Sequence, residues 1–403
     1  MPRLYRTETV SPEQFDPIFL RDSCACPRCV DQSTSQKIFE TAAIPLSIDF
    51  ADIQHLEGGG TSIRWKDDIP GYEDHRSIFS NAFLKTQVDL KSRMQASHND
   101  ISRTLWDRQI MSDDTLTLDY EAWMSDDRTL HTGLSHLRQY GLIFLKNCPW
   151  GPETMEGMAT RMGPLRNTFY GSKWDVRAVP SAKNVAYTSV HLDFHQDLLY
   201  MTDPPGFQFL HCIKSSTKGG ESLFTDAFWA IDRLDRSHTH PTSGFASFPV
   251  TFQYNNDGQW YQRTRPTLEY VDNVYSTNIP ANALSNPPKQ VLQAVNWGPP
   301  FQAPFDRGLN GAGDTKANEL RLRDYIKGAK AFKVLIEDED NIFETKMGEG
   351  VCSVFDNRRI LHARRAFTTE GGERWLRGAY VDTDAFRSRL RVLDEQFSTK
   401  NMH

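Results

Sequence analysis

The chain has 403 residues, of which 38% are hydrophobic and 24% are charged, enough for one large hydrophobic core and a smaller second domain. A net charge of −6 without a run of Lys or Arg argues against nucleic acid as a partner. The most apolar stretch, residues 141–145, is too short to span a bilayer, and the polar N-terminus carries no apolar signal segment. We therefore expect a cytoplasmic enzyme that does not contact a membrane.

The domain organisation is indicated by a polar segment without clear periodicity, residues 96–127, which we interpret as a linker. Residues 1–95 before it are predicted to form a small β-rich domain with strands at 44–50 and 62–65. A domain of this size needs a covalent or metal staple. Residues 128–403 are predicted to form the larger domain.

The cysteines fall into two groups of different expected roles. Three crowd into six residues: Cys24, Cys26 and Cys29. They can converge on one tetrahedral zinc ion if a fourth ligand joins them, and His75 in the same small domain is the candidate. Redox-active or free thiols are the alternative. The other three are scattered singly through apolar segments and are predicted to be buried core thiols: Cys148, Cys212 and Cys352.

The larger domain is predicted to contain mainly strands. A first helix is expected at 153–162, with Gly163 just beyond its end, and a second at 316–335 behind Asp314 and Thr315 as cap candidates. Apolar or alternating runs predict strands at 185–190, 207–213, 221–225, 248–254, 351–355 and 375–381. Many strands with few helices indicate a mainly β fold with α insertions, of the jelly-roll type.

Four pairs of the form His-x-Asp or His-x-Glu could supply two ligands of a non-haem iron site, which needs two histidines and one carboxylate. They are His55/Glu57, His98/Asp100, His191/Asp193 and His195/Asp197. The first two pairs lie in or before the polar segment, where no rigid support is expected, and are set aside. The other four residues would share one face of an extended strand, so periodicity alone leaves these two pairs equal.

A remote third ligand is expected at His362, which follows a strand-turn-strand pattern beginning at residue 354. Twelve residues later, Arg374 precedes the apolar run 375–381. Its guanidinium suits a carboxylate of a cosubstrate, because the planar fork can bind both oxygens. An ordinary surface arginine on a strand is the alternative for this position.

Several motifs along the chain occur together in one order. They are LRDSCACPRC (20–29), TFYGSKW (168–174), NVAY (184–187), FHQD (194–197), PPGFQFLHC (204–212), FDN (355–357), HARR (362–365) and GAY (378–380). With them the chain resembles, over nearly its whole length, the γ-butyrobetaine dioxygenases and their trimethyllysine dioxygenase relatives in the taurine-dioxygenase-like superfamily. The joint occurrence of these motifs is highly specific.

This resemblance implies an Fe(II)- and 2-oxoglutarate-dependent dioxygenase that uses O₂. It favours His195 and Asp197, with His362, as iron ligands and Arg374 as the residue that binds 2-oxoglutarate. Ser222 matches a position at which related enzymes place a threonine that touches the cosubstrate. The resemblance also implies a double-stranded β-helix, a homodimer, ascorbate as a candidate reductant, and structural Zn(II) held by Cys24, Cys26, Cys29 and His75.

The resemblance further implies a small cationic trimethylammonium substrate. A quaternary ammonium has no hydrogen to donate, so proteins hold it with the negative faces of aromatic rings. The matching rings are Tyr170, Trp174, Tyr187 and Tyr380. Core packing is the alternative explanation for aromatic residues at these positions. Asn184 matches the first of two asparagines that bind the substrate carboxylate in the family, whereas Gly298 departs from the pattern of the second.

γ-Butyrobetaine, hydroxylated to L-carnitine, is the first substrate expected, and trimethyllysine or another quaternary ammonium or secondary metabolite is the alternative. A catalytically silent protein whose zinc domain serves as an interaction module is the alternative of another class. The presence of every metal and cosubstrate residue favours the enzyme. A glycine-rich stretch, residues 308–313, is predicted to be an inserted mobile loop.

Overall fold

The computed structural model describes residues 10–57, 59–88, 103–177, 189–236, 242–270, 292–305, 315–368 and 372–398. Its contacts divide the chain into two compact units, Met1–Ile101 and Ser102–His403. Several predicted features lie outside the described residues, namely Asn184, Tyr187, the loop at 308–313, the cap candidate Asp314 and the His98/Asp100 pair. Among the described residues, no helix combines the length and the apolar character that a membrane crossing needs.

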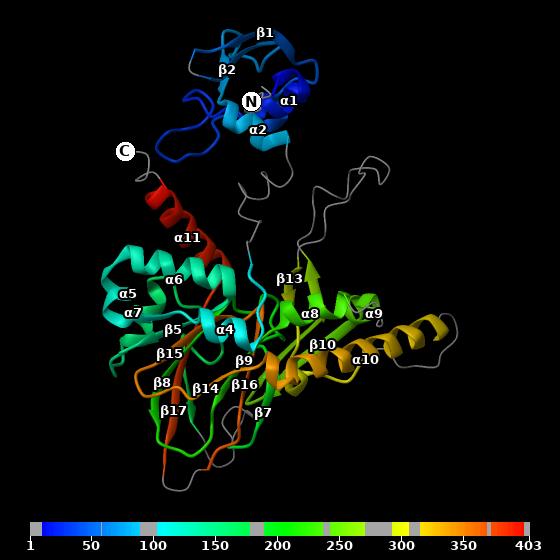
Figure 1. Ribbon diagram of the computed structural model, residues 1–403. Coiled ribbons are helices and arrows are strands. Elements are labelled where there is room, and N and C mark those ends of the chain that lie inside the picture. Colours follow the sequence, from blue (N-terminus) through cyan, green and yellow to red (C-terminus); the bar gives the residue numbers. More distant parts are fainter. Residues whose placement is uncertain are drawn as a thin grey trace, which may run out of the picture. The chain divides into compact units, whose positions relative to one another are not determined.

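The first unit is built on a three-stranded antiparallel sheet, in the order β1 (Asp49–His55), β2 (Thr61–Lys66) and β3 (Arg76–Phe79) (Figure 1). Two helices and two 3₁₀ turns complete it: α1 (Pro17–Asp22), α2 (Asn81–Val88), η1 (Pro12–Gln14) and η2 (Thr41–Ala43). Eight buried apolar side chains form its core, among them the fully buried Leu20, Ile63 and Leu84. Such a small core gives limited stability on its own.

The strand predicted at 44–50 is wrong for most of its length, because β1 begins only at Asp49. Ile44 and Ile48 are buried, but the backbone between them turns, and the Ile48 amide donates a hydrogen bond to the Pro45 carbonyl at 3.1 Å. The two buried isoleucines on either side of this turn produced the apolar pattern that predicted a strand. The strand predicted at 62–65 is confirmed by β2.

The second unit contains a six-stranded and a four-stranded sheet. The larger has the order β4 (Thr117–Asp119), β5 (Leu142–Lys146), β15 (Cys352–Asp356), β8 (Phe207–Ser215), β17 (Arg374–Val381) and β6 (Lys173–Arg177). The smaller has the order β14 (Phe343–Thr345), β9 (Ser222–Asp226), β16 (Ile360–Arg364) and β7 (Leu192–His195). Two hairpin-like pairs lie beside them: β10 (Pro249–Asn256) with β11 (Gln259–Pro266), and β12 (Leu268–Tyr270) with β13 (Leu292–Val295).

A buried apolar layer lies between the two large sheets. Phe224 of β9 and Ile360 of β16 pack there with Leu210, Phe355 and Leu376 of the larger sheet. Alternate residues of the same strands, such as Phe209 of β8, point to the other face, where helices cover the sheet. The unit is therefore a layered assembly of one mixed sheet, one antiparallel sheet and helices, and hydrogen bonding between the described strands does not close them into one barrel.

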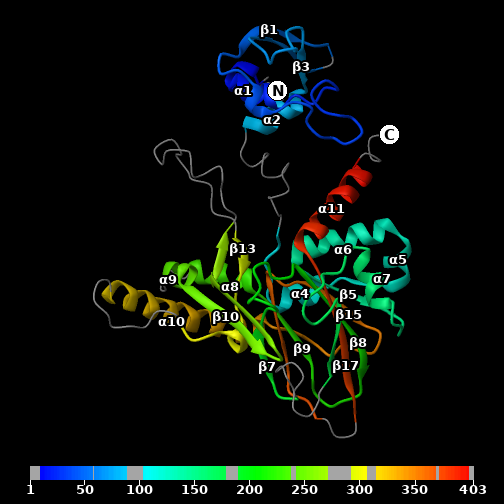
Figure 2. The same ribbon diagram turned by 180° about the vertical axis from the view of Figure 1, so that it is seen from behind.

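The helices of the second unit gather in two groups (Figures 1 and 2). One group covers the larger sheet: α5 (Tyr120–Ser125), α6 (Asp127–Tyr140), α7 (Thr154–Thr160) and α11 (Thr383–Ser398). The other packs around the hairpin side of the unit: α8 (Ala227–Arg236), α9 (Thr242–Ser247) and α10 (Thr315–Glu337). One further helix and two 3₁₀ turns complete the described elements: α4 (Arg108–Asp114), η4 (Pro299–Phe301) and η5 (Glu339–Asn341).

Part of the predicted linker at 96–127 is folded, because α4, β4 and α5 all lie within it. The polar residues that suggested a linker cap these elements. The Asp107 carboxylate accepts the Ile110 amide, and the Asp119 carboxylate accepts the amide of Glu121. The expectation of few helices is also wrong, since the sequence analysis predicted none of α6, α8 and α11. Of the strands predicted in the larger domain, only 185–190 falls mainly outside the described residues.

Gly163 does not act as the helix-ending glycine that the sequence suggested. α7 ends earlier, at Thr160, and Gly163 does not have a left-handed backbone. A Cβ at this position would lie 2.5 Å from the Cβ of Ala385 in α11. The glycine is therefore needed for the close approach of α11. The helix predicted at 316–335 is confirmed by α10, in which Tyr325 and Phe332 are buried and Ile326 is exposed.

The prediction for the three scattered cysteines is confirmed, since Cys148, Cys212 and Cys352 are all buried and free. Burial raises the pKa of the Cys148 thiol to about 12 and that of Cys212 to about 11. These thiols remain protonated at neutral pH and behave as core side chains.

Candidate functional site

The structure brings His195, Asp197 and His362 together, with candidate ligand atoms within 4.8 Å of one another. His195 is the last residue of β7, and the strand pairing places His362 of β16 directly opposite it. Asp197 follows in the adjoining turn. Its Oδ1 lies 3.4 Å from Nε2 of His195 and 3.8 Å from Nε2 of His362. Two imidazoles and one carboxylate are the donor set that suits a facial iron site.

The rival pair, His191 and Asp193, is not part of this cluster. Both side chains are about half exposed, and Nε2 of His191 lies 3.2 Å from Oδ1 of Asp193. An irregularity in the pairing of β7 with β16 lies between the residues opposite His362 and Arg364, so simple alternation does not continue along the strand. The four residues at 191, 193, 195 and 197 occupy every second position. Because of this irregularity, they do not share one environment.

One backbone carbonyl and two side chains hold the candidate ligands His195 and Asp197 in place. The Nδ1 of His195 donates to the Asp193 carbonyl at 2.8 Å, which leaves the lone pair on Nε2 for a metal. Asn357 is fully buried, and its side chain accepts the Asp197 amide at 2.9 Å and donates to the Asp197 carbonyl at 3.1 Å. The Tyr380 hydroxyl donates to Oδ2 of Asp197 at 2.7 Å.

The protonation states of the cluster also suit a divalent cation. Burial alone would raise the pKa of Asp197, but the hydrogen bond with His195, the nearby imidazoles and the Tyr380 hydroxyl lower it to about 2. Burial, with the adjacent His195, lowers the pKa of His362 to about 3. At neutral pH the site therefore offers one anionic carboxylate and at least one neutral imidazole.

The three candidate ligands line a pocket between the two large sheets. The other lining residues are Trp174, Val176, Leu192, Gln208, Leu210, Ser222, Phe224, Ala363, Arg364, Arg374 and Leu376. Arg374 begins β17 and is 9% exposed, and the described residues supply no hydrogen-bond or ion-pair partner for its guanidinium. Burial lowers its pKa to about 10, so it remains a cation at neutral pH. A buried cation that faces a pocket is suited to an anionic ligand.

Ser222 and Arg364 extend the polar part of this pocket. Ser222 begins β9 and is paired with Arg364 of β16 in the strand register. Arg364 donates to the Val190 carbonyl at 2.8 Å. Gly220 has a left-handed φ of 79°, and a Cβ there would lie 3.1 Å from Cδ of Arg374. The Gly-Gly turn before β9 therefore makes room for the arginine.

Three of the four predicted cage residues are described, and two of them are in contact. The rings of Trp174 and Tyr380 have centroids 5.2 Å apart and an interplanar angle of 34°. Gly378 lies opposite Trp174 in the strand register, and a Cβ there would be 2.3 Å from the indole. Because Gly378 has no side chain, the Trp174 indole can pack against this position of β17. Tyr170 lies in an aromatic group with Phe169 and Tyr254.

Asn296, in the segment compared with the family's second asparagine, serves the fold instead. It is 1% exposed, and its amide donates to Glu269 and to the Pro266 carbonyl, both at 2.8 Å. Its side-chain oxygen accepts a hydrogen bond from Arg358 at 2.8 Å. These contacts occupy the amide, so Asn296 does not replace the missing asparagine at position 298.

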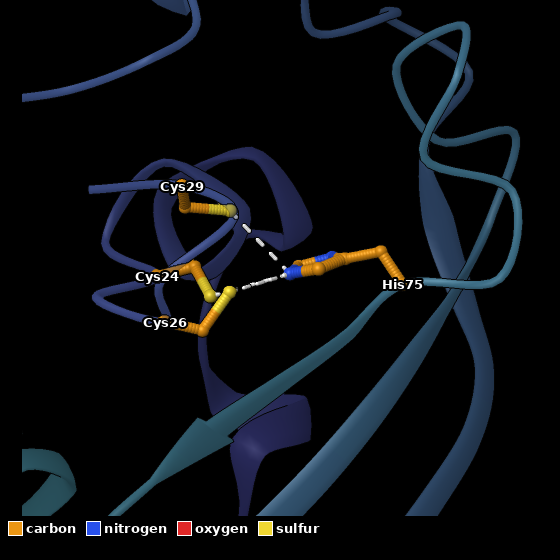
Figure 3. Close-up of side chains that lie close together, drawn as sticks. All are labelled: Cys24, Cys26, Cys29 and His75. Carbon is orange, nitrogen blue, oxygen red and sulfur yellow. Dashed lines mark hydrogen bonds between the residues drawn. The ribbon is translucent and has the colours of Figure 1, made fainter. Parts of the chain in front are cut away.

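The second cluster of potential ligands lies in the first unit (Figure 3). Nε2 of His75 lies 3.5, 3.3 and 3.4 Å from the sulfur atoms of Cys24, Cys26 and Cys29. A zinc ion with ordinary Zn–S and Zn–N bond lengths has tetrahedral edges of about 3.5 Å between sulfur and nitrogen. The three sulfur–nitrogen distances therefore fit a tetrahedral zinc ion.

Comparison with known proteins places these sites in a family. The profile of the taurine catabolism dioxygenase TauD, TfdA family matches residues 103–380. The chain belongs to the TauD, TfdA family. A second profile, gamma-butyrobetaine hydroxylase-like N-terminal, matches residues 8–85. The resemblance expected from the motifs is therefore confirmed, and the chain is a 2-oxoglutarate-dependent dioxygenase.

Three relatives show how similar the chain is to other dioxygenases over most of its length. It is 35% identical to Dioxygenase str8 of Strobilurus tenacellus, with 93% of this chain and 84% of that protein covered. It is 28% identical to the gamma-butyrobetaine dioxygenase of Pseudomonas sp., over 95% and 91% of the two chains. Identity to the trimethyllysine dioxygenase of Meyerozyma guilliermondii is 23%, over 94% and 90%.

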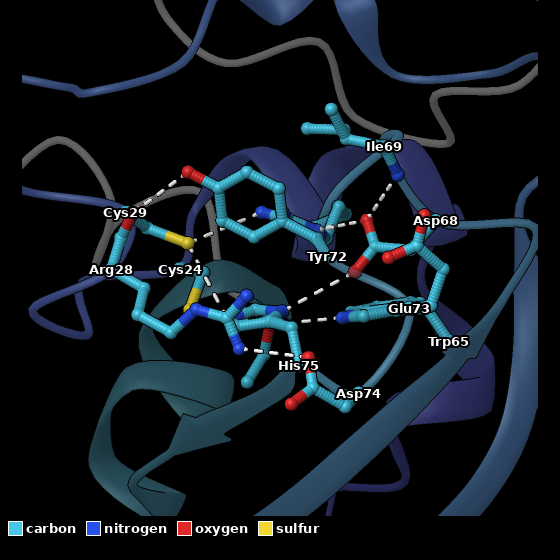
Figure 4. A network of polar contacts seen from close by, with 12 residues as sticks. Cys24, Arg28, Cys29, Trp65, Asp68, Ile69, Tyr72, Glu73, Asp74 and His75 are labelled. Atoms are coloured by element: carbon cyan, nitrogen blue, oxygen red, sulfur yellow. Dashed lines mark hydrogen bonds and ion pairs between the residues drawn. The ribbon is translucent and has the colours of Figure 1, made fainter.

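In this TauD, TfdA chain the residues that support the two clusters were not predicted from the sequence, and those around the cysteines are the clearest case. Around the cysteines, Oδ2 of Asp68 lies 3.3 Å from Nδ1 of His75 (Figure 4). The fully buried Arg21 contacts Asp68 at 2.6 Å and donates to the Cys29 sulfur at 3.4 Å. Arg21 therefore places a buried positive charge beside the cysteine cluster. Arg21 lies within the motif at 20–29, which was the one signal that could have pointed to it.

Proposed function

We propose that the protein hydroxylates a small trimethylammonium compound in an Fe(II)- and 2-oxoglutarate-dependent reaction, with γ-butyrobetaine as the first candidate and L-carnitine as its product. The observation that carries this proposal is the convergence of His195, Asp197 and His362 in one pocket with Arg374 and Trp174. The two imidazoles and the carboxylate fit Fe(II), and the buried Arg374 guanidinium fits a carboxylate of 2-oxoglutarate. The Trp174 ring, with the other predicted cage residues as an aromatic wall, fits the trimethylammonium head of the substrate.

Each residue has a defined task in this proposal. Nε2 of His195, Nε2 of His362 and Oδ1 of Asp197 would hold Fe(II). The Arg374 guanidinium would bind the distal carboxylate of 2-oxoglutarate, with the Ser222 hydroxyl beside it. When bound, iron and 2-oxoglutarate supply the activation of O₂ that puts one oxygen atom into a substrate C–H bond, as the cosubstrate becomes succinate and CO₂. Ascorbate would serve as reductant.

The substrate is proposed from the aromatic wall and from the names of the relatives. Tyr170, Trp174 and Tyr380, with Tyr187, would hold the cationic head, so that hydroxylation falls one or two carbons from the nitrogen. Asn184 would contact the anionic tail. Trimethyllysine is the second candidate, because Gly298 and the occupied Asn296 leave the family's second carboxylate contact unfilled.

Three further features belong to the same proposal. Cys24, Cys26, Cys29 and His75 would hold a structural zinc ion that stabilises residues 1–95, which we propose as a separate zinc-binding domain. The two large sheets with the pocket between them would correspond to a double-stranded β-helix. The enzyme would be a homodimer, which analytical ultracentrifugation can test.

Replacing Trp174 by alanine is expected to lower kcat/KM for trimethylammonium substrates roughly tenfold or more, because a desolvated cation–π contact is worth about 2 kcal/mol. Steady-state kinetics with γ-butyrobetaine measure the effect. Trp150→Ala is the matched control, since Trp150 is exposed and does not line the pocket. Full efficiency of Trp174→Ala would refute recognition of the charge by this ring.

Replacing Arg374 by glutamine is expected to weaken 2-oxoglutarate binding about 10- to 100-fold, because hydrogen bonds to charged groups contribute about 1.5–3 kcal/mol. Arg374→Lys should be intermediate, since lysine keeps the charge but loses the planar fork. Calorimetric titration of the Mn(II)-loaded protein measures the affinity. Arg377→Gln is the control on the same strand, because Arg377 pairs with Asp175. If Arg374→Gln bound 2-oxoglutarate as tightly as wild type, Arg374 would not be the residue that binds the cosubstrate.

A further inference from the structure

Tyr380 makes a contact that a cage wall does not require. It lies on β17, is 2% exposed, and its hydroxyl donates to Oδ2 of Asp197 at 2.7 Å. This hydrogen bond links β17 of the larger sheet to the turn that carries Asp197.

The two oxygens of Asp197 face different partners. Oδ1 is the oxygen that lies close to the Nε2 atoms of His195 and His362, at 3.4 and 3.8 Å. Oδ2 is occupied by the hydroxyl of Tyr380. Asn357 holds the backbone of the same aspartate through both its amide and its carbonyl. Every polar atom of Asp197 other than Oδ1 therefore has a partner that is not a candidate ligand.

We propose that Tyr380 is the positioning residue that makes Asp197 bind the metal through Oδ1 alone. Binding through both oxygens would occupy an additional place around the ion, and the facial arrangement depends on open positions for the cosubstrate and O₂. A hydrogen bond to Oδ2 stabilises the one-oxygen arrangement, as partners of ligating side chains generally do. This inference rests on the proposed iron site, but it does not depend on the identity of the substrate.

The hydroxyl and the ring of Tyr380 then have separable tasks. The ring lies against Trp174 and can contribute to the aromatic wall, whereas the hydroxyl serves the metal. Tyr380→Phe removes the hydroxyl and keeps the ring. Trp174→Ala does the reverse, since it alters the wall and leaves the Asp197 contacts in place. The two variants therefore distinguish the positioning role from a role in substrate binding.

The test is the Mn(II) affinity of the full-length protein without substrate, measured from the free-ion electron paramagnetic resonance signal. Tyr380→Phe is expected to bind Mn(II) roughly tenfold more weakly than wild type, as is usual when a supporting partner of a ligand is lost. Trp174→Ala should show wild-type Mn(II) affinity. Tyr325→Phe is the control for loss of a buried tyrosine hydroxyl, because Tyr325 lies in the α10 core away from the pocket.

Unchanged Mn(II) affinity in Tyr380→Phe, with thermal unfolding like that of wild type, would overturn the positioning role. An equal loss of affinity in Tyr325→Phe would also overturn it, because the effect would then be one of folding. Failure of the wild type to bind Mn(II) would instead overturn the proposed iron site, and this inference with it. Metal binding without turnover of any trimethylammonium compound would refute the proposed substrate and leave the role of Tyr380 standing.

Discussion

Replacing Asp197 by alanine is expected to abolish Fe(II)-dependent conversion of 2-oxoglutarate to succinate while the fold survives. The change removes the carboxylate from a cluster whose other members are two imidazoles, and it also leaves the Tyr380 hydroxyl without its acceptor. The loss should exceed the roughly 10- to 100-fold that removal of a supporting residue costs a metal site. His195→Ala and His362→Ala should behave alike. Succinate formation, with thermal unfolding as a check, measures the effect.

His191→Ala is the matched control for these variants, because His191 is an exposed histidine just before β7 and lies outside the cluster. It should retain wild-type turnover. Inactivation by His191→Ala and Asp193→Ala, combined with full activity of Asp197→Ala, would show that the other His-x-Asp pair binds the metal. The register of β7 would then be incorrect.

Replacing Cys29 by serine is expected to release zinc and unfold the first unit, while the second unit remains folded. The eight-residue core of the first unit is small. Structural zinc contributes roughly 10–16 kcal/mol of apparent binding energy in zinc-finger peptides. Because protons compete with zinc for thiolates, acidification should release the ion as well. Metal analysis of the purified protein measures its zinc content. Limited proteolysis of the same protein shows whether residues 10–88 remain folded.

Cys148→Ala is the control, since Cys148 is a buried thiol of the second unit without a role in the cluster. It should retain one zinc ion per chain. A wild-type protein purified without zinc, or a Cys29→Ser variant whose first unit resists proteolysis like wild type, would contradict the structural metal site.

The central strands of the second unit could be predicted because their residues are apolar on both faces. β8 lies between two sheet neighbours and is buried at seven consecutive positions, Phe207 to Ile213, so the run itself indicates a strand. The edge strand β7 has only four residues and an irregular pairing, and its pattern gives no comparable signal. The linker prediction was wrong for residues 108–125, because α4 and α5 bury few residues, including Met111 and Trp123, among many polar ones.

The side chains that form both clusters could be predicted from the sequence, but the residues that orient them could not. Asp68 and His75 are close in sequence, yet only the turn between them brings the carboxylate to the imidazole. Asn357 and Asp197 are 160 positions apart, and their contact depends on how β15 and β16 meet β7. Long-range hydrogen bonds of this kind leave no periodic pattern in a single sequence.

The most direct measurement of the central claim is incubation of the wild type with Fe(II), 2-oxoglutarate and matched substrates. These are γ-butyrobetaine, trimethyllysine and the neutral tert-butyl isostere of γ-butyrobetaine, with products followed by mass spectrometry and succinate by chromatography. We expect a trimethylammonium compound to gain one oxygen atom in step with succinate formation, and the neutral isostere to react far more slowly. Equal turnover of the isostere, or succinate formation that no trimethylammonium compound stimulates, would contradict the account.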